Sequence, residues 1–131
     1  ILIDGGFSGR EIAARLSAID RRPEDLSAIL VTHEHNDHIS GVGVLSRRFQ
    51  LPVGANPATH RAASPRLGKL SGTREFATGE SFIVRDLEVH PFPISHDTVD
   101  PVGFVVGDGR FRLACCTDTG RLTMLMSHLF S

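Results

Sequence analysis

The sequence predicts one mixed α/β domain, and three observations support this prediction. The 131 residues, 40% hydrophobic and 22% charged, have the length and composition of a globular unit with its own core. Short apolar runs that suit buried strands alternate with segments whose apolar residues recur every three or four positions, as on one face of a helix. No internal repeat, low-complexity tract or linker divides residues 1–131.

The chain opens on the end of a strand, followed by a turn and an amphipathic helix. Residues 1–4 are apolar up to Asp4, and Gly5-Gly6 has the free backbone torsions that a sharp turn needs. Ser8 can cap the next helix by accepting a hydrogen bond from its first turn. The apolar residues of that helix share one face, which we expect to lie over a sheet: Ile12, Leu16 and Ile19.

A second strand and helix flank a histidine-rich loop. Pro23-Glu24-Asp25 breaks the chain, and residues 26–31 form a short apolar run that suits a buried strand. A helical pattern follows over residues 39–49. In this helix Gly41 and Gly43 let another segment pack close to the backbone.

The rest of the chain predicts a strand, a helix, two hairpins and a final helix. Residues 52–55 suit a brief strand, and Asn56-Pro57 suits the cap and first position of a short helix that a loop follows to Gly72. Apolar runs with turn residues between them predict hairpins at 81–92 and 102–115. The apolar stretch 122–129 predicts the closing helix.

Charge, apolar stretches and cysteines narrow the class of protein. The net charge of −1 gives no global attraction for nucleic acid, so such a partner must be held locally. No run approaches the ~20 apolar residues of a membrane span, and no secretion signal is present. The only cysteines, Cys115 and Cys116, are neighbours in an apolar run, which excludes a disulfide framework and suggests buried strand residues. We expect a protein without a membrane segment, in the reducing cytoplasm.

A cluster of potential metal ligands directly follows the second predicted strand. It consists of His33, His35, Asp37 and His38. Imidazole suits zinc and similar ions, and a carboxylate also accepts harder ions such as manganese. Because of their alternation, His33 and His35 can point to one side, whereas Asp37 and His38 are offset toward a second ion. The alternative is a solvated polar loop whose histidines share no role.

Two later residues lie where further ligands would be needed. His96 and Asp118 each follow a strand-like run. Alone, such a histidine is more often structural, and the aspartate of an Asp-Thr-Gly sequence is usually a turn residue. With His33 and His35, however, His96 completes three imidazoles on one ion, and Asp118 can bridge to the other.

These motifs resemble those of the metallo-β-lactamase fold hydrolases. The order and spacing of His33-x-His35-x-Asp37-His38, Ser95-His96-Asp97 and Thr117-Asp118-Thr119-Gly120 match that superfamily over nearly the whole chain. Residues 30–48 and 91–104 are most similar to its WalJ (YycJ) branch, which is regarded as DNA-processing. The resemblance implies an αββα sandwich of four layers, with two mixed sheets face to face, helices outside and a dinuclear site at one edge.

The resemblance also assigns the ligands. The first ion would take His33, His35 and His96, and the second would take Asp37, His38 and the bridging Asp118. Asp4 corresponds to an outer-shell aspartate that orients a ligand imidazole, although a simple turn-forming role before Gly5 is the alternative. Two divalent ions are expected, either zinc or manganese, with iron as a further candidate.

The sequence departs from the family at both ends. Family members supply one more histidine to the second ion from a strand well beyond the position of Asp118. His128 lies in the apolar helical stretch and is interpreted as a core or helix-surface residue, not as a substitute ligand. The opening strands of the first sheet are also absent. We therefore expect residues 1–131 to be one partial domain, whose last ligand lies beyond Ser131.

The expected activity is metal-dependent hydrolysis. Two neighbouring cations lower the pKa of a shared water toward neutrality, so a bridging hydroxide is the expected nucleophile. Asp118 would hold the ions and the bridge, and Asp37 would steer the hydroxide. The resemblance favours a phosphodiesterase acting on DNA as an exonuclease. The alternatives are a hydrolase of small esters, thioesters or lactones on the same site and a metal-binding module without turnover.

One basic segment agrees with a nucleic-acid substrate. No acidic residue occurs from Asn56 to Arg74, where His60 is accompanied by four cationic residues that are candidate phosphate contacts: Arg61, Arg66, Lys69 and Arg74. The alternative is the solvated face of a loop. The chain contains no Trp or Tyr, so base stacking has no support.

Overall fold

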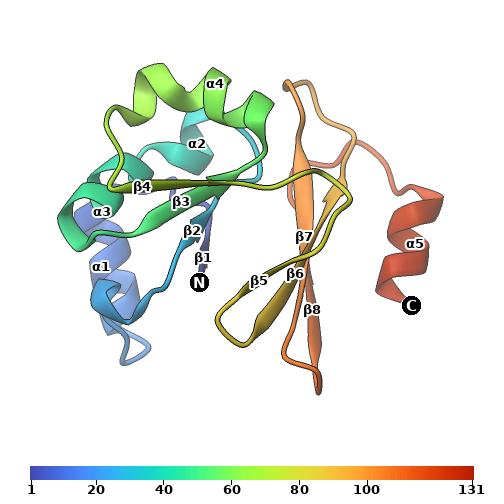
Figure 1. Ribbon diagram of the computed structural model, residues 1–131, viewed down its shortest axis with the longest axis horizontal. Coiled ribbons are helices and arrows are strands. Elements are labelled where there is room, and N and C mark those ends of the chain that lie inside the picture. Colours follow the sequence, from blue (N-terminus) through green and yellow to red (C-terminus); the bar gives the residue numbers. More distant parts are fainter.

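The computed structural model describes residues 1–131, which form four layers in the order helix, sheet, sheet, helix (Figure 1). The first sheet contains, in spatial order and all parallel, β1 (Leu2–Ile3), β2 (Ile29–Leu30), β3 (Pro52–Ala55) and β4 (Gly72–Glu75). The second contains, all antiparallel, β5 (Phe82–Val84), β6 (Leu87–Pro93), β7 (Val102–Gly107) and β8 (Arg112–Cys115). The αββα prediction is confirmed, although each sheet here is of one type rather than mixed.

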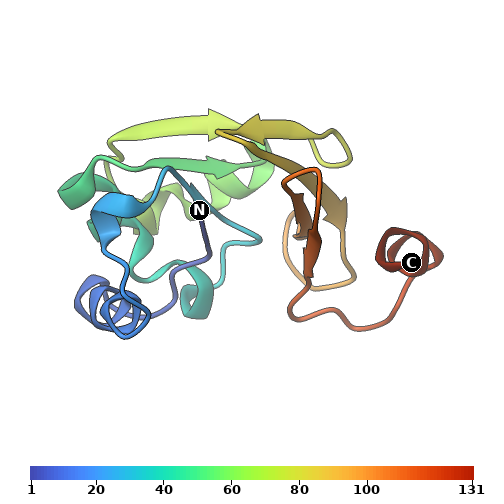
Figure 2. The same cartoon turned by 90° about the horizontal axis from the view of Figure 1, so that it is seen from below.

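Four α-helices cover the outer face of the first sheet, and one lies outside the second (Figure 2). The first four are α1 (Gly9–Ser17), α2 (Asn36–Ile39), α3 (Val42–Phe49) and α4 (Pro57–Leu67), and the fifth is α5 (Met124–Phe130). A short 3₁₀ turn, Pro23–Asp25, precedes β2. Parallel strands need such crossover helices because the chain must return to the same end of the sheet. None of the helices has the length and apolarity of a membrane span.

Three apolar clusters hold the layers together. Ile12, Leu45 and Leu67 pack helices α1, α3 and α4 onto the first sheet. Between the sheets, Leu30 packs with a group of aromatic and branched residues from the second half of the chain: Phe76, Val84, Val89, Val102 and Phe104. A smaller cluster joins Met126 of α5 to the outer face of the second sheet. The strand ends of both sheets are thereby fixed relative to each other.

Two glycines let the turn after β1 dock against the segment that follows β2. A Cβ on Gly6 would lie 1.7 Å from the carbonyl oxygen of Asp37, and one on Gly41 would lie 2.1 Å from that of Phe7. Only a residue without a side chain fits such a contact. The two segments also exchange backbone hydrogen bonds, from Gly5 N–H to the His38 carbonyl and from Gly41 N–H to the Gly5 carbonyl.

Most predicted elements are confirmed, with four corrections. The caps at Ser8 and Asn56 and both hairpins are present. The helix expected over 39–49 is divided into α2 and α3, and Ile19 is exposed because α1 ends before it, at Ser17. Strand β4 escaped prediction because its residues are polar and mostly exposed. Cys115 and Cys116 are half-buried rather than buried, because β8 is exposed over most of its length.

Candidate metal centre

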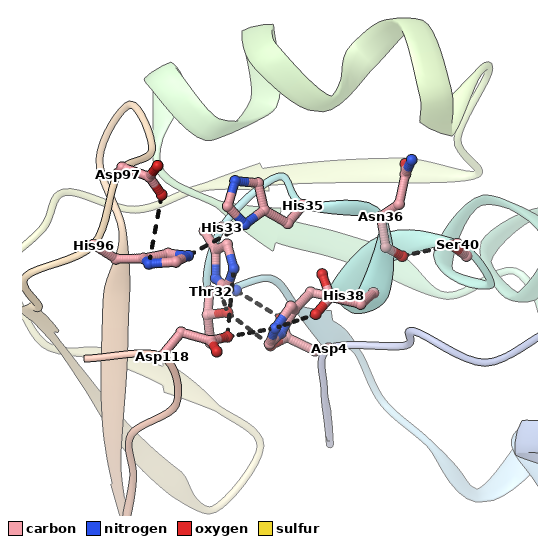
Figure 3. A network of polar contacts seen from close by, with 11 residues as sticks. Asp4, Thr32, His33, His35, Asn36, His38, Ser40, His96, Asp97 and Asp118 are labelled. Carbon is pink, nitrogen blue, oxygen red and sulfur yellow. Dashed lines mark hydrogen bonds and ion pairs between the residues drawn. The ribbon is translucent and has the colours of Figure 1, made fainter. Parts of the chain in front are cut away.

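The predicted ligands converge where strands of both sheets end (Figure 3). The backbone continues from β2 through Val31 and Thr32 into His33, and it has turned into α2 by the position of His38. His96 follows β6, and Asp118 follows β8. Asp4 follows β1, the neighbour of β2. Loops at strand ends can therefore bring side chains from distant parts of the chain to one point.

Three imidazoles form the first group, which we call the three-histidine group: His33, His35 and His96. Their ligand atoms lie within 4.8 Å of one another. His96 Nε2 is 3.2 Å from His35 Nδ1, although the two residues come from different sheets. The His33 side chain is fully buried, and its Nε2 has no hydrogen-bond partner. A buried polar atom without a partner is costly, and a bound cation would satisfy it, so the residues fit a divalent ion.

A second group, which we call the Asp118 group, includes a carboxylate. It consists of His33, His38 and Asp118. Asp118 Oδ2 is 2.7 Å from His38 Nε2 and 3.7 Å from His33 Nε2, so the carboxylate faces the Nε2 atoms of two rings whose centres are 4.0 Å apart. His33 belongs to both groups, which makes it the residue that joins them. Asp37 lies at the rim: its carboxylate is 3.6 Å from His38 Nε2, and 78% of its side chain is exposed.

Asp4 and Thr32 orient two of the rings. Asp4 Oδ1 accepts the backbone N–H of Thr32 at 2.8 Å, and Asp4 Oδ2 is 2.7 Å from both the Thr32 hydroxyl and His38 Nδ1. The Thr32 hydroxyl has one proton and donates it to the carboxylate, so it accepts from His33 Nδ1 at 2.9 Å. Both rings therefore carry a proton on Nδ1, which leaves Nε2 as the atom that could bind a metal.

The two carboxylates nearest to His38 belong to residues with an unusual backbone conformation. Asp4 and Asp118 have φ values of 61° and 55°, in the left-handed region. Aspartate tolerates this conformation better than most residues but still at a cost of about 1 kcal/mol or more. Glycine would remove that cost but could not supply a carboxylate, so the strain is associated with the position of these two side chains.

The pKa values of the two oriented histidines shift in opposite directions. Burial, followed by the neighbouring charge of His38, lowers the pKa of His33. Burial also acts to lower the pKa of His38, but the hydrogen bond and charge of Asp4, with the charges of Asp37 and Asp118, outweigh it and raise that pKa. His33 is thus prepared to bind a cation as a neutral ring, whereas in the metal-free protein His38 holds a proton between carboxylates.

The basic residues of the 56–74 segment are exposed but have different surroundings. Arg66 Nη1 donates to the Glu34 carbonyl at 2.6 Å, so this side chain contacts the metal-ligand loop itself. The Arg74 guanidinium lies 5.0 Å from the centre of the Phe82 ring. Arg61 and Lys69 are exposed, and His128 is exposed on α5, outside both ligand groups.

Sequence reasoning missed two residues of the site. Thr32 links Asp4 to His33, but only the parallel register of β1 with β2 brings it beside Asp4. Glu34 is buried between His33 and His35, and its carboxylate accepts the backbone N–H of Val99 from the loop after β6. Its place in the histidine motif was a signal, but its partner depends on how the two sheets face each other.

Several known proteins resemble the chain in sequence or in fold. Residues 1–120 match the model of the metallo-beta-lactamase superfamily. The chain is 41% identical to exodeoxyribonuclease WalJ of Streptococcus pneumoniae serotype 2 (strain D39 / NCTC 7466), over 97% of this chain and 49% of that protein. It is 38% identical to exodeoxyribonuclease YycJ of Bacillus anthracis, over 92% and 46% respectively.

A solved structure extends the comparison of folds. The Zn(2+)-bound PqqB from Methylobacterium extorquens shares the fold with a TM-score of 0.76 at 18% identity, over 97% of this chain and 51% of that one. The chain thus spans about half the length of the relatives that it matches.

Proposed function

The chain belongs to the metallo-β-lactamase superfamily, and we propose that it is part of a metal-dependent exodeoxyribonuclease that hydrolyses DNA phosphodiester bonds. The similarity to WalJ and YycJ supports the substrate class. The observation that carries the metal-dependent part is the meeting of two ligand groups at His33, whose buried Nε2 has no hydrogen-bond partner.

In this proposal each ligand group holds one divalent ion. His33, His35 and His96 would hold the first, and His38 with Asp118 would hold the second, with Asp37 as its further ligand from the rim. The mixture of imidazole and carboxylate suits zinc or manganese, with iron as a third candidate. Two such ions, when bound, supply an activated water at neutral pH and neutralise the charge of a phosphodiester.

The protein's own side chains would position the metal ligands and the attacking group. Asp118 faces the Nε2 atoms of both His33 and His38. Asp4 holds the His38 ring through Nδ1 and reaches His33 through Thr32, so one carboxylate orients rings of both groups. Asp37 is the most exposed of the proposed ligands, and its carboxylate would steer the attacking hydroxide.

DNA would be held near the site by local positive charge. The net charge of −1 provides no general attraction for a polyanion. Arg61, Arg66, Lys69 and Arg74 are exposed, and Arg66 contacts the ligand loop, so a phosphate next to the site can reach its remaining N–H donors.

A DNA substrate and the two free thiols favour a cytoplasmic setting. We also propose that residues 1–131 form one part of a single catalytic domain.

The test compares substrate classes with the full-length protein. Loaded with manganese or zinc, it should degrade end-labelled linear DNA and a chromogenic phosphodiester but leave thioesters and lactones intact. Asp37→Ala should abolish DNA degradation, whereas Asp86→Ala, the same change in the exposed β5–β6 turn, should not alter it. Cleavage of thioesters or lactones without DNA degradation would instead identify an acyl hydrolase. Metal binding without any turnover would identify a non-catalytic metal-binding module.

A further inference from the structure

The three-histidine group depends on how two loops from different sheets are tied together. His33 and His35 lie on the loop after β2, and His96 lies on the loop after β6. Nevertheless, His96 Nε2 lies only 3.2 Å from His35 Nδ1. A small change in the separation of the loops would move one imidazole out of range, because ligand distances to a metal tolerate only about 0.2 Å.

Glu34 connects these loops directly. Its Oε1 accepts the backbone N–H of Val99 at 3.2 Å, three positions after His96. The Val99 N–H directly follows a tight turn that begins at His96, in which Thr98 N–H donates to the His96 carbonyl at 3.0 Å. The carboxylate therefore holds the turn that carries His96, while the flanking residues of Glu34 are themselves two members of the three-histidine group.

The backbone of Glu34 is anchored from the opposite side. Arg66 of α4 donates to the Glu34 carbonyl at 2.6 Å. The neighbouring Thr32 carbonyl accepts the Val102 N–H at 3.0 Å, which ties the start of β7 to the same loop. Glu34 is thus fixed at its main chain and engages the second loop with its side chain, as a rigid brace requires.

The energetics of Glu34 show that it does more than fill space. The residue is only 9% exposed, its Oε2 has no hydrogen-bond partner, and no cationic side chain lies within ion-pair distance of its carboxylate. A buried, incompletely paired carboxylate destabilises a fold. An apolar residue of similar size would be more favourable here if packing were the only role.

We propose that Glu34 is a positioning residue that sets the separation of His96 from His33 and His35 by holding the Val99 N–H. Its contribution comes from the reach and acceptor oxygen of the side chain, not from its negative charge. The inference rests on the metal centre proposed above. It predicts that divalent metal binding depends on residue 34 even in the absence of substrate.

Three variants separate reach from charge in the full-length protein. Glu34→Gln keeps the length and an acceptor oxygen but loses the charge, whereas Glu34→Asp keeps the charge but is too short to reach Val99. Glu34→Ala loses both. Co²⁺ is titrated into each metal-free variant while visible absorption reports the ligand geometry, and zinc affinity is measured by competition with a chelator.

Glu34→Gln should bind within about twofold of the natural protein and give the same cobalt spectrum. Glu34→Asp and Glu34→Ala should bind the first ion roughly tenfold more weakly, as expected for an outer-shell partner of a ligand, with an altered spectrum. Glu88→Ala, at the exposed start of β6, is the matched control and should change neither quantity.

Two results from the variants would contradict the proposed role of Glu34. Equal affinity in Glu34→Ala and the natural protein would show that the Val99 contact is dispensable. Loss of affinity in Glu34→Gln but not in Glu34→Asp would show that charge, not reach, matters. If the natural protein itself binds no cobalt or zinc, the proposed metal centre is wrong, and so is the proposed role of Glu34. Thermal unfolding of each variant separates these outcomes from loss of the fold.

Discussion

The two ligand groups share His33 but differ in charge, exposure and support. The three-histidine group is built from imidazoles, and its central ring is fully buried. The Asp118 group contains a carboxylate that is 40% exposed, and the still more exposed Asp37 lies beside it. The three-histidine group is therefore the more enclosed of the two, whereas the Asp118 group is more open to solvent. We expect an ion in the Asp118 group to be the more sensitive to protons.

The largest expected effect comes from the residue that both groups share. His33→Ala should remove the first ion, because it deletes one of the three imidazoles that would hold it, and should weaken the second, because Asp118 loses one of the two rings beside it. The lost charge removes several kcal/mol of transition-state stabilisation, so DNA degradation by the full-length protein should fall at least ~10³-fold. Metal content and activity are measured together, with circular dichroism to check folding. Two bound ions per chain in this variant would contradict the assignment of His33 to the first ion.

Asp118→Asn should affect the second ion but not the first. The amide keeps the size of the side chain but removes the negative charge that faces His33 and His38. The second ion should be lost while the three-histidine group keeps the first, so metal content should fall from two ions to one. We expect a decrease in activity of ~100-fold, since one of two charge-stabilising ions remains. Retention of both ions would show that Asp118 is not needed for binding.

Much of this site could be predicted from sequence because its ligands follow recognisable patterns. His33, His35 and His38 are close in sequence, and His96 and Asp118 each follow an apolar run that forms a strand. The alternation of side chains on extended backbone is a local property, so it can be inferred without tertiary structure.

The supporting contacts could not be predicted in the same way. The link from Asp4 through Thr32 to His33 spans two strands and depends on their register. The contact of Glu34 with Val99 depends on the packing of one sheet against the other. Strand β4 shows the same limitation, since its polar residues pair with β3 without an apolar pattern of their own.

Asp4→Asn tests whether orientation of the rings matters separately from the ligands. The variant keeps a hydrogen-bonding side chain but weakens the contacts with His38 and Thr32. Metal affinity should fall by roughly 10- to 100-fold, as for other outer-shell partners of metal-bound histidines. Calorimetric titration should locate the greater loss in the second ion, because Asp4 contacts His38 directly but His33 only through Thr32. An equal loss for both ions would contradict that ranking.

The opposite pKa shifts predict different pH dependence for the two ions. Because the pKa of His38 is raised, an ion entering the Asp118 group must displace its proton at any pH below that raised value. Affinity for the second ion should therefore decrease by up to about tenfold per pH unit as pH falls through this range. The lowered pKa of His33 keeps its ring neutral near pH 6.5, so it adds no such competition.

Calorimetric titrations of zinc at several pH values between about 6 and 8 test this difference. The apparent affinity of the weaker site should decline first as the solution is acidified. In the metal-free protein, protonation of His38 stabilises the fold, because its pKa is higher in the folded than in the unfolded state. This stabilisation is fully present at pH values below the unfolded-state pKa and is lost as pH rises through the folded-state pKa. Identical pH profiles for both ions would remove the distinction between the groups.

The smallest effect is expected at His128. This histidine is exposed on α5, outside both groups, and its carbonyl rather than its ring accepts hydrogen bonds, from the hydroxyl and N–H of Ser131. His128→Ala should change metal content and DNA degradation by less than about twofold, in the range of ordinary surface substitutions. Loss of one ion in this variant would assign the ring to the site after all.

The most direct test of the two-group account is anomalous X-ray diffraction from crystals of the full-length protein grown with zinc or manganese. Two anomalous peaks are expected, one among His33, His35 and His96 and the other beside His38 and Asp118. A single peak, or peaks away from these side chains, would contradict it.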